Sequence, residues 1–256
     1  MAEFESWRSY WEFHRTVSRE LRFVRTREAE QFLETVLATS AKRRTDFKEG
    51  YVFWRSQLGH DWREEGEEGA TFEVLRAYPP ERMKPLRDRA SDGRANPKGI
   101  PCLYLATERD TAIAEVRPWI GSHVSVAQFR TLRPLTIIDC SRGHNKMNLY
   151  FEEPDVVERE EAVWSSIDRA FAKPITRSDH YADYVPTQII AELFKREGLD
   201  GVAYKSNFGK NGYNIALFDL DAAALLNCTL YEVNKVTMVS EQVDNTYFVK
   251  ENLGKG

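Results

Sequence analysis

Apolar side chains recur at helical spacing through the first 45 residues of the chain, among many charged ones. Trp7 and Trp11 mark the first apolar stripe, and residues 32–37 mark the second. A period of 3.6 residues indicates amphipathic helices, so we expect two helices that pack on the rest of the protein through these stripes. The basic run 42–44 follows, and we interpret it as the solvated end of the second helix. We expect this region to support folding or partner contact and not catalysis.

From residue 51 onward the pattern changes to short runs rich in β-branched and aromatic residues, separated by Gly, Pro and Asn. Such runs predict strands. We expect strands at residues 51–55, 102–106, 124–129, 135–140, 201–205 and 213–218, and a last one within 228–239. Helices are expected at 110–117, 156–171 and 186–197, with a long loop at 79–99. Helices and strands in this irregular order indicate the α+β class.

The short helix near residue 110 is of interest because it carries a lone charge. Asp110 and Thr111 can cap its start, and Pro118 disfavours its continuation beyond residue 117. Glu115 stands near its end, among Ala, Ile and Val neighbours. We therefore expect Glu115 to project from an otherwise apolar helical turn.

The composition is that of a packed globular protein, because 42% of the 256 residues are hydrophobic and 30% are charged. The formal net charge is −4 and the pI is about 5.9, so no overall positive field attracts nucleic acid, and no direct nucleic-acid contact is expected. Apolar runs are short, and the first residues lack the basic and apolar segments of a secretion signal. We expect a cytoplasmic protein that does not enter a membrane.

The cysteines and histidines carry no metal pattern. Cys102, Cys140 and Cys228 include no CxxC pair and lie in apolar, strand-like surroundings, which predicts buried free thiols. The histidines show neither HxxxH nor HxH spacing, so neither a metal nor a cofactor is expected. No GxGxxG or GxxxxGK[ST] motif follows a predicted strand, so a nucleotide site of the Rossmann or P-loop kind is excluded.

A group of short segments carries the polar residues that suggest chemistry. In chain order they are Phe53-Trp54-Arg55, Gly93-Arg-Ala-Asn-Pro-Lys-Gly99 with Leu103-Tyr104-Leu105, Thr111-Ala-Ile-Ala-Glu115, and Tyr204-Lys-Ser206 with Asn214. In this order and at these spacings they resemble the RES domain family, which is named for an arginine, a glutamate and a serine. The matching positions are Arg55, Glu115 and Ser206, and the resemblance covers residues 48–220.

The resemblance implies an ADP-ribosyltransferase-like mixed β core with surrounding helices, here with an N-terminal helical extension. It implies NAD as the substrate, destroyed by hydrolysis or, with inorganic phosphate as co-substrate, by phosphorolysis. It also implies a toxin paired with a helix-turn-helix, Xre-like antitoxin. We divide the chain into an extension at 1–47, a catalytic domain at 48–240 and a tail at 241–256. The extension and a helical insert at 141–181 depart from the family and are expected to leave the chemistry intact.

The central pair makes chemical sense without the family. Cleavage of the bond between nicotinamide and ribose passes through an oxocarbenium-like state, and the Glu115 carboxylate can stabilise its positive charge. The alternative is a surface glutamate paired with Arg109 or Arg117. Arg55 lies in an aromatic strand and can grip a diphosphate with two parallel hydrogen bonds. Its alternative is a structural ion pair with a buried carboxylate.

Further candidates surround this pair. The Ser206 hydroxyl can orient a ribose or Glu115 itself, or merely cap the turn that follows it. Tyr104 alternates with two leucines and so points to the opposite face of its strand, where it can stack on nicotinamide or belong to the core. The remaining candidates for substrate contact are loop residues and polar residues at element starts, each with a solvated or structural alternative: Arg94, Asn96, Lys98, Tyr184, Gln188 and Asn214.

Two other functions compete with NAD breakdown. An ADP-ribosyltransferase of this shape often has an acidic or amide side chain two residues before the catalytic glutamate, where this chain has Ile113. This difference favours breakdown of NAD over transfer to a macromolecule. The second alternative is a module that binds a nucleotide without catalysis.

Overall fold

The structure is a computed structural model that describes all residues except 1, 68–69, 145–149, 174–180, 209–211 and 246–256. Its helices are α1 (Ser9–Arg19), α2 (Arg27–Ser40), α3 (Pro80–Met83), α4 (Arg109–Glu115), α5 (Val156–Ala172) and α6 (Val185–Arg196), with 3-10 turns η1 (Ala41–Arg43) and η2 (Tyr181–Tyr184). Its strands are β1 (Arg44–Phe47), β2 (Val52–Leu58), β3 (Asp61–Glu67), β4 (Ala70–Arg76), β5 (Leu103–Ala106), β6 (His123–Thr131), β7 (Leu135–Asp139), β8 (Gly201–Lys205), β9 (Tyr213–Leu217) and β10 (Ala223–Glu232).

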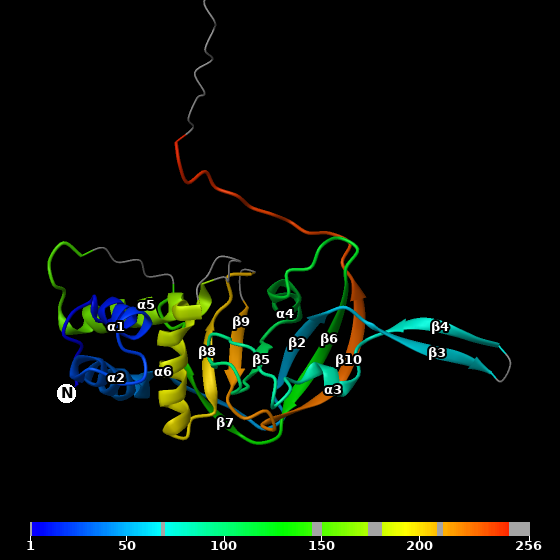
Figure 1. Ribbon diagram of the computed structural model, residues 1–256, viewed down its shortest axis with the longest axis horizontal. Coiled ribbons are helices and arrows are strands. Elements are labelled where there is room, and N and C mark those ends of the chain that lie inside the picture. The colour runs from blue at the N-terminus through cyan, green and yellow to red at the C-terminus, as the bar shows by residue number, and fades with distance from the viewer. Residues whose placement is uncertain (1, 68–69, 145–149, 174–180, 209–211, 246–256) are drawn as a thin grey trace, which may run out of the picture.

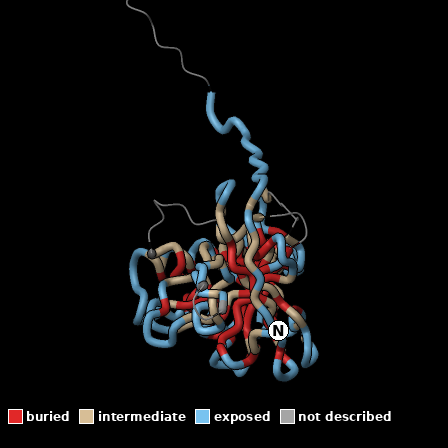
Figure 2. The backbone as a smooth tube through the Cα atoms, turned by 90° about the vertical axis from the view of Figure 1, so that its right-hand side faces the viewer, coloured by how far each residue is buried: buried red, intermediate tan, exposed pale blue. Residues whose placement is uncertain are grey.

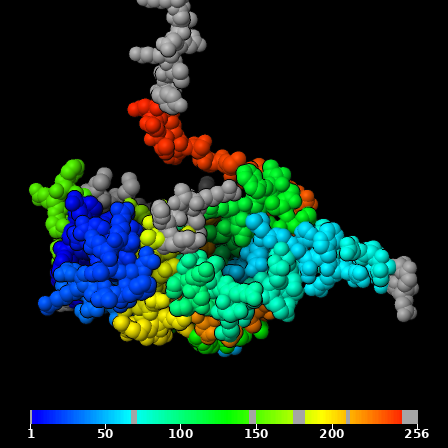
Figure 3. All heavy atoms as spheres, in the orientation of Figure 1, coloured from blue at the N-terminus to red at the C-terminus, as the bar shows by residue number. Residues whose placement is uncertain are grey.

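One mixed sheet organises the molecule, with strand order β1-β7-β8-β9-β5-β2-β6-β10. Only β7 and β8 run parallel among these neighbours, and their connection contains α5 and α6. The β3–β4 hairpin forms a separate two-stranded sheet that projects from one end of the body, opposite α1 and α2 (Figures 1 and 3). The predicted α+β class, with a mixed β core, surrounding helices and an N-terminal helical extension, is confirmed.

The sheet separates two hydrophobic cores because its side chains alternate between its faces. On β5, Leu103 and Leu105 enter the core that also contains Phe53 and Phe129. Tyr104, between the two leucines, packs against the other core, which α1, α2, α5 and α6 cover. Figure 2 shows the buried chain concentrated inside the body, whereas residues 234–245 are exposed. The main sheet, on which the candidate site described below lies, therefore has a hydrophobic core on each face.

The two N-terminal helices are confirmed. Trp7 precedes α1, is half-buried and contacts the Tyr150 ring, whereas the prediction that Trp11 packs on the rest of the protein is wrong. The buried face of α1 is formed by Tyr10, Phe13 and Val17, while Trp11 is 55% exposed. Positions 10, 13 and 17 share one side of a helix, and residue 11 is turned about 100° away from residue 10. Both helices pack in the same core as α5 and α6, and β1 pairs with β7 of the main sheet.

The basic run 42–44 after α2 was predicted to be solvated, but its central residue, Arg43, is buried. Arg43 is only 8% exposed, its Nη1 donates to the Arg142 carbonyl at 2.9 Å, and its guanidinium lies 4.4 Å from the centroid of the Trp164 ring. Lys42 and Arg44 are exposed as expected. Arg43 thus joins the N-terminal segment to α5 instead of facing solvent.

Most predicted elements have their observed counterparts, with shifts at the ends. The short helix begins at Arg109 after Glu108, whose side chain makes no cap, so Asp110 is not the capping residue. The last strand starts earlier than expected, at Ala223, and ends at Glu232. Strand β1 and the β3–β4 hairpin were not predicted, because β1 is short and the hairpin is rich in glutamate and glycine.

Candidate active site

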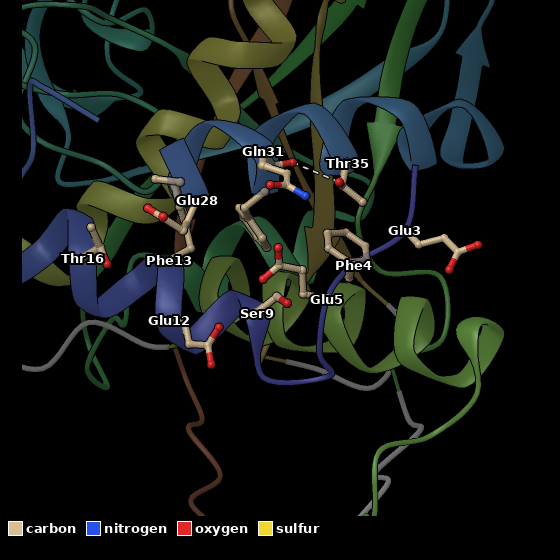
Figure 4. A pocket seen from close by; sticks show the side chains of 12 residues that line it. Glu3, Phe4, Glu5, Ser9, Glu12, Phe13, Thr16, Glu28, Gln31 and Thr35 are labelled. Atoms are coloured by element: carbon tan, nitrogen blue, oxygen red, sulfur yellow. Dashed lines mark hydrogen bonds between the residues drawn. The ribbon is translucent and has the colours of Figure 1, made fainter. Parts of the chain in front are cut away.

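A small pocket and a large cleft among the described residues differ greatly in volume. A pocket of about 60 Å³ lies between α1 and α2, where Phe4 and Phe13 meet the carboxylates of Glu5, Glu12 and Glu28 (Figure 4). A cleft of about 770 Å³ lies over the main sheet. Ligand sites measure roughly 300–1,000 Å³, so the cleft is large enough for a dinucleotide and the small pocket is not.

The cleft opens where two neighbouring strands separate. β2 pairs with β6 along its whole length, from Val52 to Leu58. Its contact with β5, by contrast, is a single pair, Trp54 with Ala106. Because the strands diverge beyond this pair, side chains and main chain of both are accessible in the cleft. Helix α4 contacts both strands, which places Glu115 beside the opening.

Glu115 is held by two side-chain hydrogen bonds from neighbouring strands. The Ser206 hydroxyl donates to Oε1 at 2.6 Å, and Asn214 Nδ2 donates to the same oxygen at 2.6 Å. No hydrogen bond from the described residues reaches Oε2, which leaves this oxygen available to the cleft. Arg109, one of the two alternative partners, pairs with Asp110 instead. The carboxylate is therefore fixed in place with one oxygen uncommitted.

The backbone around α4 sets the position of this carboxylate. Arg117, with φ of 48°, is the only residue other than glycine with a positive φ in the described part of the chain, and it ends the helix before Pro118. Near the start of α4, Gly212 lies so close to Thr111 that a Cβ at position 212 would overlap the threonine side chain. A larger residue at 212 would push α4, and Glu115 with it, away from Ser206.

Ser206 combines two of the roles expected for it. Besides donating to Glu115, its hydroxyl oxygen accepts the Phe208 N–H at 3.0 Å and so caps the turn after β8. The hydroxyl has one proton, and the charged carboxylate is the stronger acceptor for it. The turn thus orients the hydroxyl, and the hydroxyl orients the carboxylate.

Arg55 lines the cleft, and no carboxylate among the described residues pairs with it. Its Nη1 donates to the Tyr104 carbonyl at 2.9 Å, and its Nε is buried with no hydrogen bond in the described part of the structure. Burial lowers the pKa of Arg55 to about 10, so the guanidinium stays charged at neutral pH. The alternative of a structural ion pair is not what the geometry shows. A buried cation with unused donors is suited to an anionic ligand.

Arg94 reaches the cleft from the glycine-containing loop. Its Nη1 donates to the Ala170 carbonyl at 2.8 Å, and its guanidinium lies 5.3 Å from the centroid of the Tyr184 ring. Ala170 lies in the last turn of α5, where unpaired carbonyls give the helix a negative end that favours a cation. Tyr184 is buried under Arg94 and does not itself line the cleft.

The loop that carries Arg94 is pinned by several of the predicted substrate-binding residues. The Tyr104 hydroxyl donates to Asn96 Oδ1 at 2.7 Å, and Asn96 Nδ2 donates to the Ser91 carbonyl at 3.0 Å. Gln188 Nε2 donates to the carbonyls of Gly93 and Asn96, at 2.9 and 3.0 Å. The side-chain oxygens and nitrogens of Asn96 and Tyr104 are thereby occupied within the protein. They shape the loop, although the Tyr104 ring also lines the cleft.

The predicted residues thus divide into three groups. Arg55, Arg94, Tyr104, Glu115 and Asn214 line the cleft, with Ser206 bonded to Glu115. Asn96, Tyr184 and Gln188 lie behind it as supports. Lys98 is exposed on the loop and outside the cleft.

Several cleft residues had no role in the sequence-based assignment. They include Trp54, Asp92, Arg117, Phe171, Lys173, Tyr204 and Phe208. Phe171 lies in the last turn of α5 and Lys173 directly follows this helix, both in the helical insert that was expected to leave the chemistry intact. Arg55, Arg94, Arg117 and Lys173 outnumber the cleft carboxylates, Asp92 and Glu115. A protein of negative net charge therefore has a positively charged cleft, which favours a phosphate-bearing ligand.

The part of the chain that the structure describes contains neither a metal-binding cluster nor a cysteine that lines the cleft. No cluster of three His, Cys, Asp or Glu side chains there could hold a metal ion. Cys102 and Cys140 are buried free thiols as predicted, and burial raises the pKa of Cys102 to about 11. Cys228 is half-buried. Within the same residues, no helix is both long and apolar enough to cross a membrane.

Comparison with known proteins supports the assignment from the motifs. The RES domain pattern matches residues 72–235, which include Arg94, Glu115, Ser206 and Asn214 but begin after Arg55. A chain in the crystal structure of the M. tuberculosis MbcT–MbcA toxin–antitoxin complex is similar to this one, with 13% identity and a TM-score of 0.41 over 77% of this chain and 92% of that chain. No curated protein matches the sequence. Because the match covers more than half of its length, the chain belongs to the RES domain family.

Proposed function

We propose that this protein cleaves NAD at the bond between nicotinamide and ribose, with Glu115 as the catalytic carboxylate. The observation that carries the proposal is the geometry of Glu115, whose Oε1 accepts hydrogen bonds from Ser206 and Asn214 within a positively charged cleft. NAD is the substrate in this proposal, and no cofactor is required.

Cleavage of the bond between nicotinamide and ribose requires a fixed negative charge more than a proton donor. When the bond from C1′ of the ribose to the nicotinamide nitrogen breaks, its electron pair leaves with the nitrogen. Nicotinamide, which carried the positive charge, departs as a neutral molecule and needs no acid. The positive charge moves to the ribose as an oxocarbenium ion, which a carboxylate stabilises. Glu115 Oε2 is the oxygen that meets this charge.

The cations of the cleft suit the rest of the substrate. Arg55 lines the cleft with no acidic partner among the residues that the structure describes, and Arg94 is held at the cleft wall by a helix carbonyl. A guanidinium grips a diphosphate through parallel N–H bonds, as a lysine cannot. With the diphosphate fixed by these cations, the ribose is brought to Glu115 as a positioned substrate, which lowers the entropy cost of reaction.

The reaction ends when an oxygen attacks the ribose carbon. Water yields ADP-ribose and releases a proton to solvent, whereas inorganic phosphate yields a phosphorylated ADP-ribose. Transfer to a protein or nucleic acid is a third ending, but Ile113 stands where such transferases often use a polar residue, and it does not line the cleft. We propose breakdown of NAD over macromolecular transfer for this reason.

The biological role proposed here follows from the family. Enzymes that destroy NAD arrest growth unless they are restrained, so we propose a cytoplasmic toxin neutralised by a helix-turn-helix, Xre-like antitoxin, active in stress or phage defence. A growth assay with and without the neighbouring reading frame tests this role. Arrest with unchanged intracellular NAD would contradict it.

The activity itself is tested with the purified full chain. We expect nicotinamide to be released from NAD by the wild-type protein and not by Glu115→Gln, with products identified by chromatography and mass spectrometry. Phosphate buffer is compared with a phosphate-free buffer to separate hydrolysis from phosphorolysis. If NAD binds but remains intact in both buffers, the protein is a nucleotide-binding module and the proposed activity is wrong.

A further inference from the structure

A buried carboxylate lies behind the cleft and is not used by the chemistry above. Asp168, in α5, has a side chain only 1% exposed. Its Oδ2 contacts Nδ1 of His144, and its Oδ1 accepts the Lys205 N–H at 3.4 Å. Burial raises the pKa of Asp168, while His144 acts in the opposite direction. An unpaired carboxylate at this depth would be costly, so the histidine is what allows it to be buried.

Asp168 occupies a place that a strand leaves open. In the parallel pair, the last residues in register are Asp139 of β7 and Ala203 of β8. Cys140 then donates its N–H to the Ala203 carbonyl, and β7 has ended. Residues two apart in a strand direct their N–H groups to the same side, so the Lys205 N–H faces the gap beyond β7. Asp168 supplies the acceptor that the missing strand does not.

The residue after Lys205 is Ser206, whose hydroxyl holds Glu115. The connection therefore runs from His144 to Asp168, through one hydrogen bond to the Lys205 main chain, and from the adjoining Ser206 to the catalytic carboxylate. The same end of α5 also accepts a hydrogen bond from Asn207 Nδ2 at the Ala172 carbonyl, at 2.7 Å. Helix α5 thus fixes the end of β8 at two successive points around Ser206.

From this geometry we infer that Asp168 and His144 are positioning residues, which hold the end of β8 so that the Ser206 hydroxyl keeps Glu115 in its catalytic place. The inference rests on the proposed NAD cleavage for its kinetic readout. It gives the helical insert a part in the reaction. Neither residue touches the substrate, because neither lines the cleft.

The kinetic test compares Asp168→Ala with Asp168→Asn in the full chain. Alanine removes the acceptor for the Lys205 N–H, whereas the asparagine oxygen retains it. Displacement of a catalytic group by about 1 Å can cost 10²-fold in rate, so we expect Asp168→Ala to lower kcat by on the order of 10-fold or more, with KM changed less than about twofold. Asp168→Asn should restore most of the rate. Glu160→Gln is the matched control, because Glu160 is a carboxylate of the same helix that pairs with Lys42 and does not line the cleft.

A double-mutant cycle separates positioning from general stability. If Asp168 acts through Ser206, then Asp168→Ala should lower kcat by less than about twofold in a Ser206→Ala background. Equal losses of kcat in both backgrounds would overturn the inference. If Asp168→Ala does not fold, His144→Ala carries the same cycle, because the histidine side chain is 26% exposed and its removal leaves Asp168 without its partner.

A readout without substrate keeps this inference separate from the proposed function. Amide hydrogen exchange at Lys205 should accelerate by about 10-fold or more in Asp168→Ala or His144→Ala, and remain unchanged in Glu160→Gln. Unchanged exchange at Lys205 in both variants would refute the positioning role. If the wild-type protein leaves NAD intact but exchange accelerates as expected, the proposed activity fails while the structural connection stands.

Discussion

Two groups of charged residues in the cleft are held by different means. In the first, called here the acidic end, the Glu115 carboxylate is held by side chains, the Ser206 hydroxyl and the Asn214 amide. In the second, called the cationic end, Arg55 and Arg94 are held by main-chain carbonyls, those of Tyr104 and Ala170. A carbonyl remains when its own side chain is replaced, but a hydroxyl or an amide does not. The acidic end is therefore sensitive to single substitutions of its supports, and the cationic end is sensitive mainly to substitution of the arginines themselves.

The difference also follows from what each end has to do. A diphosphate is bound in the ground state and needs cations in approximately the right place. An oxocarbenium ion exists only in the transition state, and its stabilisation depends on preorganised charge. Side-chain donors on Oε1 restrain the carboxylate. The Arg55 guanidinium, by contrast, lines the cleft and donates from Nη1 to a main-chain carbonyl. The two ends should consequently differ in which kinetic constant responds to mutation.

The largest effect is expected from Glu115→Gln. The amide keeps the shape and an oxygen to accept from Ser206, but it removes the negative charge opposite the oxocarbenium ion. We expect kcat to fall by roughly 10² or more with modest change in NAD binding. Steady-state kinetics, with circular dichroism to confirm folding, measures this. Cleavage of NAD at the wild-type rate would mean that Glu115 is not the catalytic carboxylate.

A smaller effect, on the other constant, is expected from Arg55→Lys. Lysine keeps the charge but loses the planar fork, so the cost should appear mainly in KM and amount to about 1–3 kcal/mol. Arg109→Lys is the matched control, because Arg109 pairs with Asp110 at the surface and does not line the cleft. A fall in kcat without a change in KM would remove the proposed distinction between the two ends.

Glu115 and Ser206 could be predicted from the sequence more readily than the role of Asn214, which also supports the carboxylate. Helical spacing before Pro118 and the strand ending at Ser206 placed both residues next to turns, and the order of the motifs related them to each other. Asn214 was a weak candidate, yet it bonds Glu115 directly. Its role depends on the register of β8 with β9, in which Tyr204 faces Asn214, and no local pattern specifies that register.

The loop residues illustrate the opposite limit. Asn96 and Gln188 were candidates for substrate contact as polar residues in a loop and at a helix start. An amide has the same donors and acceptor whether it meets a ligand or a main-chain carbonyl, so the sequence could not separate these roles. Lys173 and Asp168 were missed for another reason. Asp168 lies in α5 and Lys173 directly follows it, and the position of this helix over β8 results from packing between segments distant in sequence.

A moderate effect is expected from Gln188→Leu, which tests whether the loop supports act on the cationic end. Leucine fills similar space but leaves the carbonyls of Gly93 and Asn96 without the Nε2 donor. Loss of these bonds should destabilise the fold by about 1–3 kcal/mol and raise KM a few-fold, with kcat nearly unchanged. The control is Thr187→Val in the same helix as Gln188, which removes the hydrogen bond from the Thr187 hydroxyl to the Tyr184 carbonyl. An effect confined to kcat would place Gln188 with the acidic end instead.

The smallest effect is expected from Lys98→Ala, whose counterpart is Arg94→Ala in the same loop. Both cations were candidates for phosphate contact, but Lys98 is exposed and only Arg94 lines the cleft. An exposed charge outside the site acts through solvent over a Debye length of about 8 Å at physiological salt, so Lys98→Ala should raise KM by less than about twofold, and less still at higher salt. Arg94→Ala should raise KM clearly more, and its effect should persist with salt because the guanidinium is partly buried. Titration of KM against salt concentration for both variants distinguishes them. If the two substitutions raise KM equally, the cationic end extends beyond the cleft, and the loop as a whole attracts the substrate.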